Sequence, residues 1–200
     1  MGTIFGKIDV ETPKFELLHT CPDYEIRKYS PSVVAQVSYY PSQLRGNPDG
    51  GFSILANYIG ALGRPHNKKP EKIAMTAPVI TLQTEKIATT APVITTEGGG
   101  GEERTVTMQF VLPAKYRRAE DAPAPTDERV VVREEQERKY GVVRFSGVAT
   151  DEVVKEKVGK LRGSLERDGH RIAGEYLLAR YNPPWTLPHF RTNEIMLPIE

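Results

Sequence analysis

Residues 71–81 read EKIAMTAPVIT and residues 85–95 read EKIATTAPVIT, so the chain carries one stretch twice, with Met75 against Thr89 as the single difference. The period, fourteen residues from Glu71 to Glu85, is too short for a solenoid, whose repeats need about 20 residues or more. β-Branched residues surround one proline in each copy, which predicts an extended strand at a sheet edge or a bulge. Residues 82–84 would then form the turn of a protruding hairpin. We expect the repeat to extend a fold rather than to build it.

Apolar alternation and turn signals predict the elements around the repeat. The expected strands are 15–20, 24–29, 33–39, 105–112, 176–181 and 195–199, and residues 129–133 and 140–147 read as a further hairpin. Two helices are expected, one over 52–62 that Gly63 closes and one over 151–167 that Thr150 caps. The order strands, helix, strands occurs twice. This order predicts an α+β fold of two half-units, with a mostly antiparallel sheet packed against two helices.

Composition limits the functions that the chain can have. The 200 residues suit a single domain over 1–200, in which 83–104 form the repeat hairpin and a Gly-rich insertion. With 27 basic and 26 acidic side chains, the chain lacks the basic excess of a nucleic-acid binder. The single cysteine, Cys21, excludes an internal disulfide and a CxxC site for zinc or covalent haem. Without a signal peptide or a run of about 20 apolar residues, we expect a soluble, cytosolic monomer with no membrane span.

The first predicted helix is unusual because no charged residue lies between Phe52 and Leu62. One face must lie on the sheet, which leaves a second apolar flank around Ile54, Tyr58 and Ala61. The connector 117–126 could cover this flank. Alternatively, the flank forms the floor of a groove for a flat apolar ligand. A cluster of basic residues at the exit of the helix favours a ligand with peripheral carboxylates; its members are Arg64, His66, Lys68, Lys69 and Lys72.

Several phrases of the sequence resemble the SOUL/haem-binding protein family. They are KIAMTAPV at 72–79, PAPTDERV at 123–130, YNPPWTLP at 181–188 and RTNEIMLP at 191–198, together with FGKIDVETPKFELL from Phe5 and YEIRKY at 24–29. The resemblance runs in order from about Phe5 to the C-terminus, and the wording is similar to plant-type cytosolic members. It implies two pseudo-symmetric halves that join into one distorted, barrel-like antiparallel sheet with two main helices.

The resemblance also implies non-covalent binding of haem or free porphyrin in a shallow groove beside the first helix, as a carrier or buffer. Taken with the helix pattern, the candidate pigment contacts are Ile54, Leu55, Tyr58, Ile59, Leu62, Arg64, His66, Lys68, Tyr181 and Trp185. Asn57 stands where related sequences can carry a lysine, so one propionate contact of the family is in question here. The resemblance implies no family-wide axial ligand, and His66 is the histidine nearest the expected groove.

An enzyme is not expected, because the sequence has no nucleophile elbow, P-loop or GxGxxG motif. A second hypothesis is a protein-interaction or small-molecule-sensing module without physiological haem binding. In that case the repeat hairpin would receive a protein partner, since exposed strand edges invite the addition of a further strand.

Overall fold

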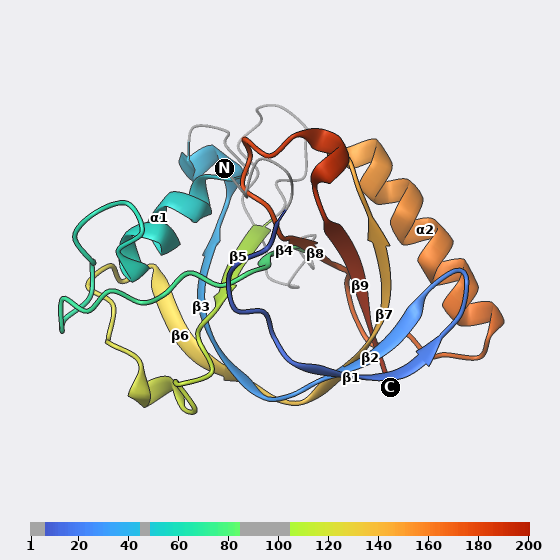
Figure 1. Ribbon diagram of the computed structural model, residues 1–200, viewed down its shortest axis with the longest axis horizontal. Helices are drawn as coiled ribbons and strands as arrows, with labels where there is room; N and C mark the ends of the chain where they lie inside the picture. The colour runs from blue at the N-terminus through green and yellow to red at the C-terminus, as the bar shows by residue number, and fades with distance from the viewer. Residues whose placement is uncertain (1–6, 45–48, 85–104) are drawn as a thin grey trace, which may run out of the picture.

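The computed structural model describes residues 7–44, 49–84 and 105–200. Within these ranges, nine antiparallel strands form one sheet that curves into a half-barrel, with α1 and α2 on its outer side (Figure 1). The strands are β1 (Phe15–Thr20), β2 (Glu25–Tyr29), β3 (Ser32–Tyr39), β4 (Val79–Thr84), β5 (Thr105–Val111), β6 (Val130–Glu135), β7 (Arg138–Phe145), β8 (Leu177–Arg180) and β9 (Asn193–Ile199). The helices are α1 (Gly50–Ile59) and α2 (Asp151–Arg167), with 3₁₀ turns η2 (Pro41–Leu44), η3 (Ala119–Asp121) and η4 (Pro188–Phe190). The strand order is β1-β2-β7-β9-β8-β4-β5-β3-β6.

Two half-units of the same plan meet in the middle of this sheet. In one, β3 leads through α1 to β4 and β5, and in the other, β7 leads through α2 to β8 and β9. In each half, the last strand lies between the other two. The halves join where β4 pairs with β8, from Val79 opposite Arg180 to Leu82 opposite Leu177. The predicted α+β fold of two strand–helix–strand halves with a barrel-like antiparallel sheet is therefore confirmed.

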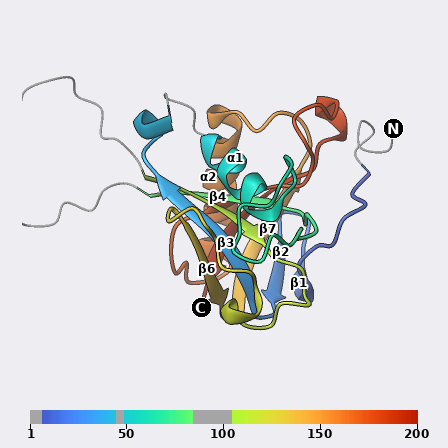
Figure 2. The same ribbon diagram turned by 90° about the vertical axis from the view of Figure 1, so that its left-hand side faces the viewer.

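Each helix covers its own half of the sheet with a separate apolar core. α1 buries Leu55, Tyr58 and Ile59 over β3, β5 and β6, the side from which Figure 2 is viewed. α2 buries Leu161 and Leu165 over β7 and β9. Because the helices take the outer face, the residues of alternate parity on the strands point to the inner face of the half-barrel.

The helix ends follow local chemistry. The Val153 amide donates to the Thr150 side chain at 3.4 Å, which confirms the predicted N-cap of α2. α1 ends at Ile59 rather than at the predicted Leu62. Gly60 adopts a left-handed conformation with φ of 79°, which a glycine accepts without steric cost, and so closes the helix early.

Two short links close one end of the half-barrel. Residues 30–31 join β2 to β3, and residues 136–137 join β6 to β7. Because a chain spans only about 3.5 Å per residue, these links draw opposite ends of the strand order together, at the bottom of Figure 1. The hairpin expected from 129–133 and 140–147 is wrong, since β6 pairs with β3 while β7 pairs with β2 and β9.

The last three residues of the first copy of the repeat, 79–81, lie in the sheet, and residues 71–78 lead into it. These residues begin β4, which pairs with β5 on one side and with β8 on the other. Residues 82–84 therefore continue a strand instead of forming the expected turn. The second copy, 85–95, and the rest of the expected insertion up to residue 104 lie outside the described residues.

Candidate functional site

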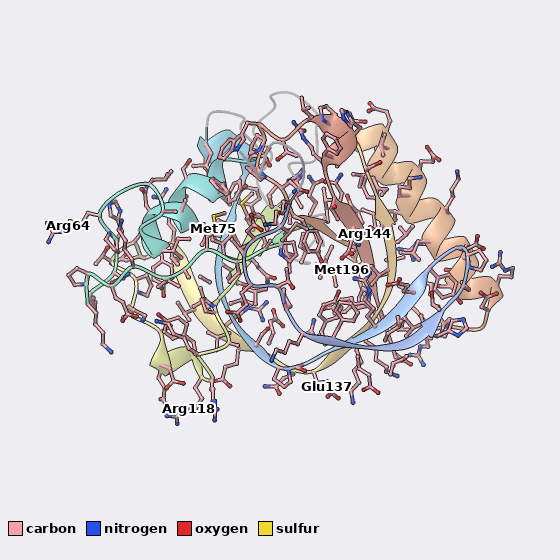
Figure 3. All side chains as sticks on the ribbon, in the orientation of Figure 1. Arg64, Met75, Arg118, Glu137, Arg144 and Met196 are labelled. Atoms are coloured by element: carbon pink, nitrogen blue, oxygen red, sulfur yellow. The ribbon has the colours of Figure 1, made fainter. Side chains whose placement is uncertain are left out.

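A cavity of about 120 Å³ lies on the inner face of the half-barrel, at the end that the two links close. Its apolar floor comes from the central strands, through Ile80 of β4, Val111 of β5, Leu177 of β8 and Met196 of β9. Figure 3 shows Met196 within the curve of the sheet. The strand alternation explains this floor, because the neighbours of these residues along each strand face the helices.

Three tyrosines form the walls of this cavity: Tyr29, Tyr140 and Tyr181. The rings of Tyr29 and Tyr140 meet edge to face, with 5.7 Å between their centroids and 80° between their planes. This is the geometry that aromatic pairs prefer. The cavity therefore has a predominantly apolar and aromatic lining.

A buried ion pair on the same face of the sheet, beside the cavity lining, fixes two of the tyrosines. Arg27 Nη1 lies 3.0 Å from Glu194 Oε1, and their side chains are only 6% and 3% exposed. Arg27 also donates to the Tyr29 hydroxyl at 3.2 Å and to Glu25 Oε2 at 2.6 Å. The Tyr181 hydroxyl donates to Glu194 Oε2 at 2.7 Å. Each ring is thus held at its hydroxyl end by a charged group that cannot move freely.

Burial keeps these two tyrosines neutral at ordinary pH. Burial raises the pKa of Tyr29 to about 12, against a smaller opposing effect of the Arg27 hydrogen bond. Burial, and then the Glu194 carboxylate, raise the pKa of Tyr181. Burial alone would lower the pKa of Arg27, but Glu194 and Tyr29 outweigh it and the pKa is raised. The tyrosines can therefore contact a ligand as rings and hydrogen-bonding hydroxyls, not as bases near neutral pH.

Charges gather at the mouth of the cavity, on β6 and β7. Arg133 forms an ion pair with Glu135 and also donates to Gln36 Oε1 at 2.6 Å. Arg138 reaches Glu135 only at 3.9 Å, the outer limit of an ion pair, and its side chain is 56% exposed. Two cations and one anion line this mouth, so one positive charge is in excess.

The uncharged face of α1 is mostly enclosed. Leu55, Tyr58 and Ile59 are buried in the core. The Tyr58 hydroxyl donates to the carbonyl oxygen of Pro123 at 2.8 Å, so the connector 117–126 covers this part of the helix. Of the two explanations for the apolar flank, covering by the connector is the one observed for Tyr58. Ile54 is half-buried. None of the three cavities described for the molecule is lined by α1.

The other predicted contacts do not lie together: four follow α1, Tyr181 lines the inner-face cavity, and Trp185 is exposed after β8. Leu62, Arg64, His66 and Lys68 are exposed on the segment that follows α1, and the Leu62 side chain has 60% exposure. Figure 3 shows Arg64 at the outer edge of the molecule. Tyr181 instead lies in the inner-face cavity, and Trp185 is 68% exposed in the segment between β8 and η4. The pigment-binding role of all ten residues stays a prediction.

The described residues contain neither a cluster of metal-ligating side chains nor a helix that could span a membrane. Across residues 7–44, 49–84 and 105–200, no three side chains of His, Cys, Asp or Glu gather as a metal ion would need. The backbone amide of His66 donates to the Asn57 carbonyl oxygen at 2.9 Å, and its side chain is exposed. No helix in the described part of the chain is long and apolar enough to cross a bilayer.

Arg27, Glu194, Tyr29 and Tyr140 were missed as site residues by sequence reasoning. A signal exists for Glu194, because it stands directly before the apolar run IMLP of β9, whereas Arg27 carries no such signal because Glu25 and Lys28 stand near it in YEIRKY. A charged residue within an apolar strand indicates a buried partner.

Solved structures with a similar fold share little sequence with this chain. The C-terminal domain of EcmrR matches with a TM-score of 0.56 and 12% identity over 88% of this chain and 98% of that domain. A hydrolase from Listeria innocua matches with a TM-score of 0.55 and 12% identity over 92% of this chain and 94% of that one. Such low identity shows the fold alone. No curated protein matches, whereas the family model described as SOUL heme-binding protein matches residues 10–198.

Proposed function

The chain belongs to the SOUL heme-binding protein family, and from this we propose that it binds haem or free porphyrin non-covalently, as a carrier or buffer. The observation that carries the proposal is the extent of the family match, which includes both half-units. Covalent attachment through thioethers would need a pair of cysteines, and Cys21 is the single cysteine of the chain. The proposed role is binding and release, without a reaction on the pigment.

The proposed pigment surface is the end of α1 and the segment that follows it. Leu62 offers an exposed apolar side chain there, and the half-buried Ile54 lies two turns before it on the chain. Arg64, Lys68, Lys69 and Lys72 are exposed around this segment. A tetrapyrrole has a flat apolar ring and, in haem, two propionates, so it would lie against the apolar residues with its carboxylates toward the cations. The ligand would remain partly in solvent, which suits exchange with other proteins.

Titration of the purified protein with haemin and with metal-free protoporphyrin tests this function. Each pigment is expected to give a saturable change in its Soret band and quenching of Trp185 fluorescence. Comparable affinities would mean that iron coordination by His66 contributes little. If neither pigment gives a saturable change, the proposed function is wrong.

A matched pair of variants tests the location separately. Leu62→Asp should weaken haemin binding about tenfold, because it places a carboxylate where the ring would lie. Val148→Asp alters another exposed apolar side chain, just before α2, and should leave the affinity unchanged. Equal binding by Leu62→Asp and the unaltered protein would reject this surface while leaving the binding function in place.

The second candidate function is a protein-interaction module. The edge strand β1 favours it, because Phe15, Leu17 and Leu18 are all exposed there and one backbone edge of β1 is unpaired within the described sheet. This candidate would be supported if the unaltered protein captured a partner in pull-downs both with and without haem, and the Leu18→Lys variant did not. The repeat segment, where we also expected a partner, lies outside the described residues.

A further inference from the structure

The inner-face cavity is not used by the proposed tetrapyrrole surface, which lies on the opposite side of the sheet. Its volume of about 120 Å³ is comparable with the roughly 150 Å³ of an engineered apolar cavity that accommodates benzene. It is well below the roughly 300–1,000 Å³ of pockets that enclose drug-sized ligands. The cavity therefore has room for one aromatic ring and cannot enclose a tetrapyrrole.

The walls are held open by interactions that the ligand would not have to supply. Tyr29 is anchored by Arg27 and Tyr181 by Glu194, through the hydroxyl contacts of 3.2 and 2.7 Å. Rings fixed in this way cannot rotate into the empty space without breaking a hydrogen bond to a buried charge. A site that is ordered before binding loses less side-chain entropy when the ligand enters.

The charges select the sign of the ligand. Among the described lining residues, the one carboxylate is that of Glu135, which already pairs with Arg133, and the buried Glu194 carboxylate beside the lining is compensated by Arg27. A ligand cation would therefore find no uncompensated anion on the floor and would meet Arg133 and Arg138 at the mouth. A ligand carboxylate could instead accept hydrogen bonds from Arg138, whose contact with Glu135 is long.

We propose that the inner face of the half-barrel binds a small aromatic carboxylate, with its single ring between Tyr29, Tyr140 and Tyr181 and its carboxylate at Arg138. This site is separate from the tetrapyrrole surface and does not depend on the proposed function. A chain that failed to bind haemin would still be expected to bind the aromatic acid.

Three probes of the same shape test the proposal on the full chain: phenylacetate, its neutral analogue phenylacetamide, and the cation phenethylammonium. Amide chemical shifts in ¹⁵N-labelled protein should change saturably with phenylacetate, with the largest changes in β8 and β9. Phenylacetamide should bind about fivefold more weakly, because it lacks the charge that Arg138 would pair with. Binding of phenethylammonium as tightly as phenylacetate would overturn the proposal.

Variants locate the site. Arg138→Gln should weaken phenylacetate about fivefold and leave phenylacetamide unchanged. Arg144→Gln is the matched control: Arg144 lies on the same strand, outside the cavity lining, and contacts Thr192 (Figure 3). Leu177→Trp should fill the cavity and abolish binding, and Ile80→Trp provides the same test if that variant does not fold. Unchanged binding in a folded filling variant, or displacement of phenylacetate by stoichiometric haemin, would overturn the proposal.

Discussion

Arg27 on β2 and Glu194 on β9 form an ion pair across the intervening strand β7, with 3.0 Å between Nη1 and Oε1. Both side chains are almost wholly removed from water. The attraction within such a pair is largely offset by the cost of desolvating both charges, so the pair adds little net stability. Removing one partner alone would nevertheless destabilise the protein strongly, because it leaves the other as a buried charge without its counter-charge.

Glu194→Ala is expected to lower the free energy of unfolding by about 3 kcal/mol, because Arg27 would keep a buried charge whose remaining anionic partner, Glu25, is partly exposed. Urea unfolding followed by circular dichroism measures this loss. The double variant Arg27→Met, Glu194→Met should recover most of it. Glu156→Ala, which removes an exposed partner of Lys160, should change the stability little. A loss for Glu194→Ala no larger than that of this control would contradict the interpretation.

Gly141 allows α2 to approach the sheet closely. A Cβ at this position would lie 2.6 Å from Leu165 Cδ1, and Leu165 is fully buried. Gly141→Ala is therefore expected to destabilise the protein by about 2 kcal/mol through overpacking. Gly159→Ala serves as the control on α2, where a Cβ meets no atom within 4 Å. Thermal melts should show a higher Tm for Gly159→Ala, since alanine favours a helix interior, and a lower Tm for Gly141→Ala.

The raised pKa of Tyr29 predicts that the folded protein loses stability in alkali. Its pKa is raised by burial from 10.0 to about 12, so above pH 10 the unfolded chain loses this proton while the folded chain keeps it. The stabilisation is complete below pH 10 and is lost as the pH rises toward 12. Urea midpoints measured between pH 9 and pH 12 should fall less steeply for Tyr29→Phe than for the unaltered protein. Equal slopes would show that Tyr29 ionises freely in the folded state.

The cations after α1 are expected to recognise carboxylates. The double variant Arg64→Gln, Lys68→Gln should weaken protoporphyrin binding about fivefold at low salt and leave its dimethyl ester within about twofold. The same charge loss on α2, in Lys155→Gln, Arg162→Gln, should have no effect. Fluorescence quenching titrations at two salt concentrations measure the affinity of each double variant for the acid and for the ester. An equal loss of affinity for acid and ester would indicate that the variant perturbs packing rather than charge recognition.

Much of the fold could be predicted because its signals are local. The stripe Val154, Leu161, Leu165 and the cap at Thr150 define α2 within its own segment. The connection of β6 to β7 could not be predicted in this way, because two neighbouring strands usually form a hairpin. Here, the short link instead crosses between the half-units, and this depends on the curvature of the whole sheet.

The inner-face cavity was missed for a related reason. Sequence alternation shows that one face of each strand is apolar, but it does not show that a curved sheet also encloses the other face. Arg27 and Glu194 are 167 residues apart, so neither residue alone predicts the other as its partner. The absence of charge along α1 left two explanations for its apolar flank, and the structure shows enclosure of Tyr58 by the core and by the connector 117–126.

The duplicated segment repeats the chain that leads into β4 and the first three residues of that strand, Val79, Ile80 and Thr81. The buried residues of the first copy, Ile73, Thr76, Ala77, Pro78 and Thr81, are each repeated by the same residue type fourteen positions later. The one mismatch falls at Met75, whose side chain is 37% exposed, so it does not alter the buried set. Either copy can therefore supply the first three residues of β4, whereas Leu82, Gln83 and Thr84 of that strand have no identical counterpart after the second copy.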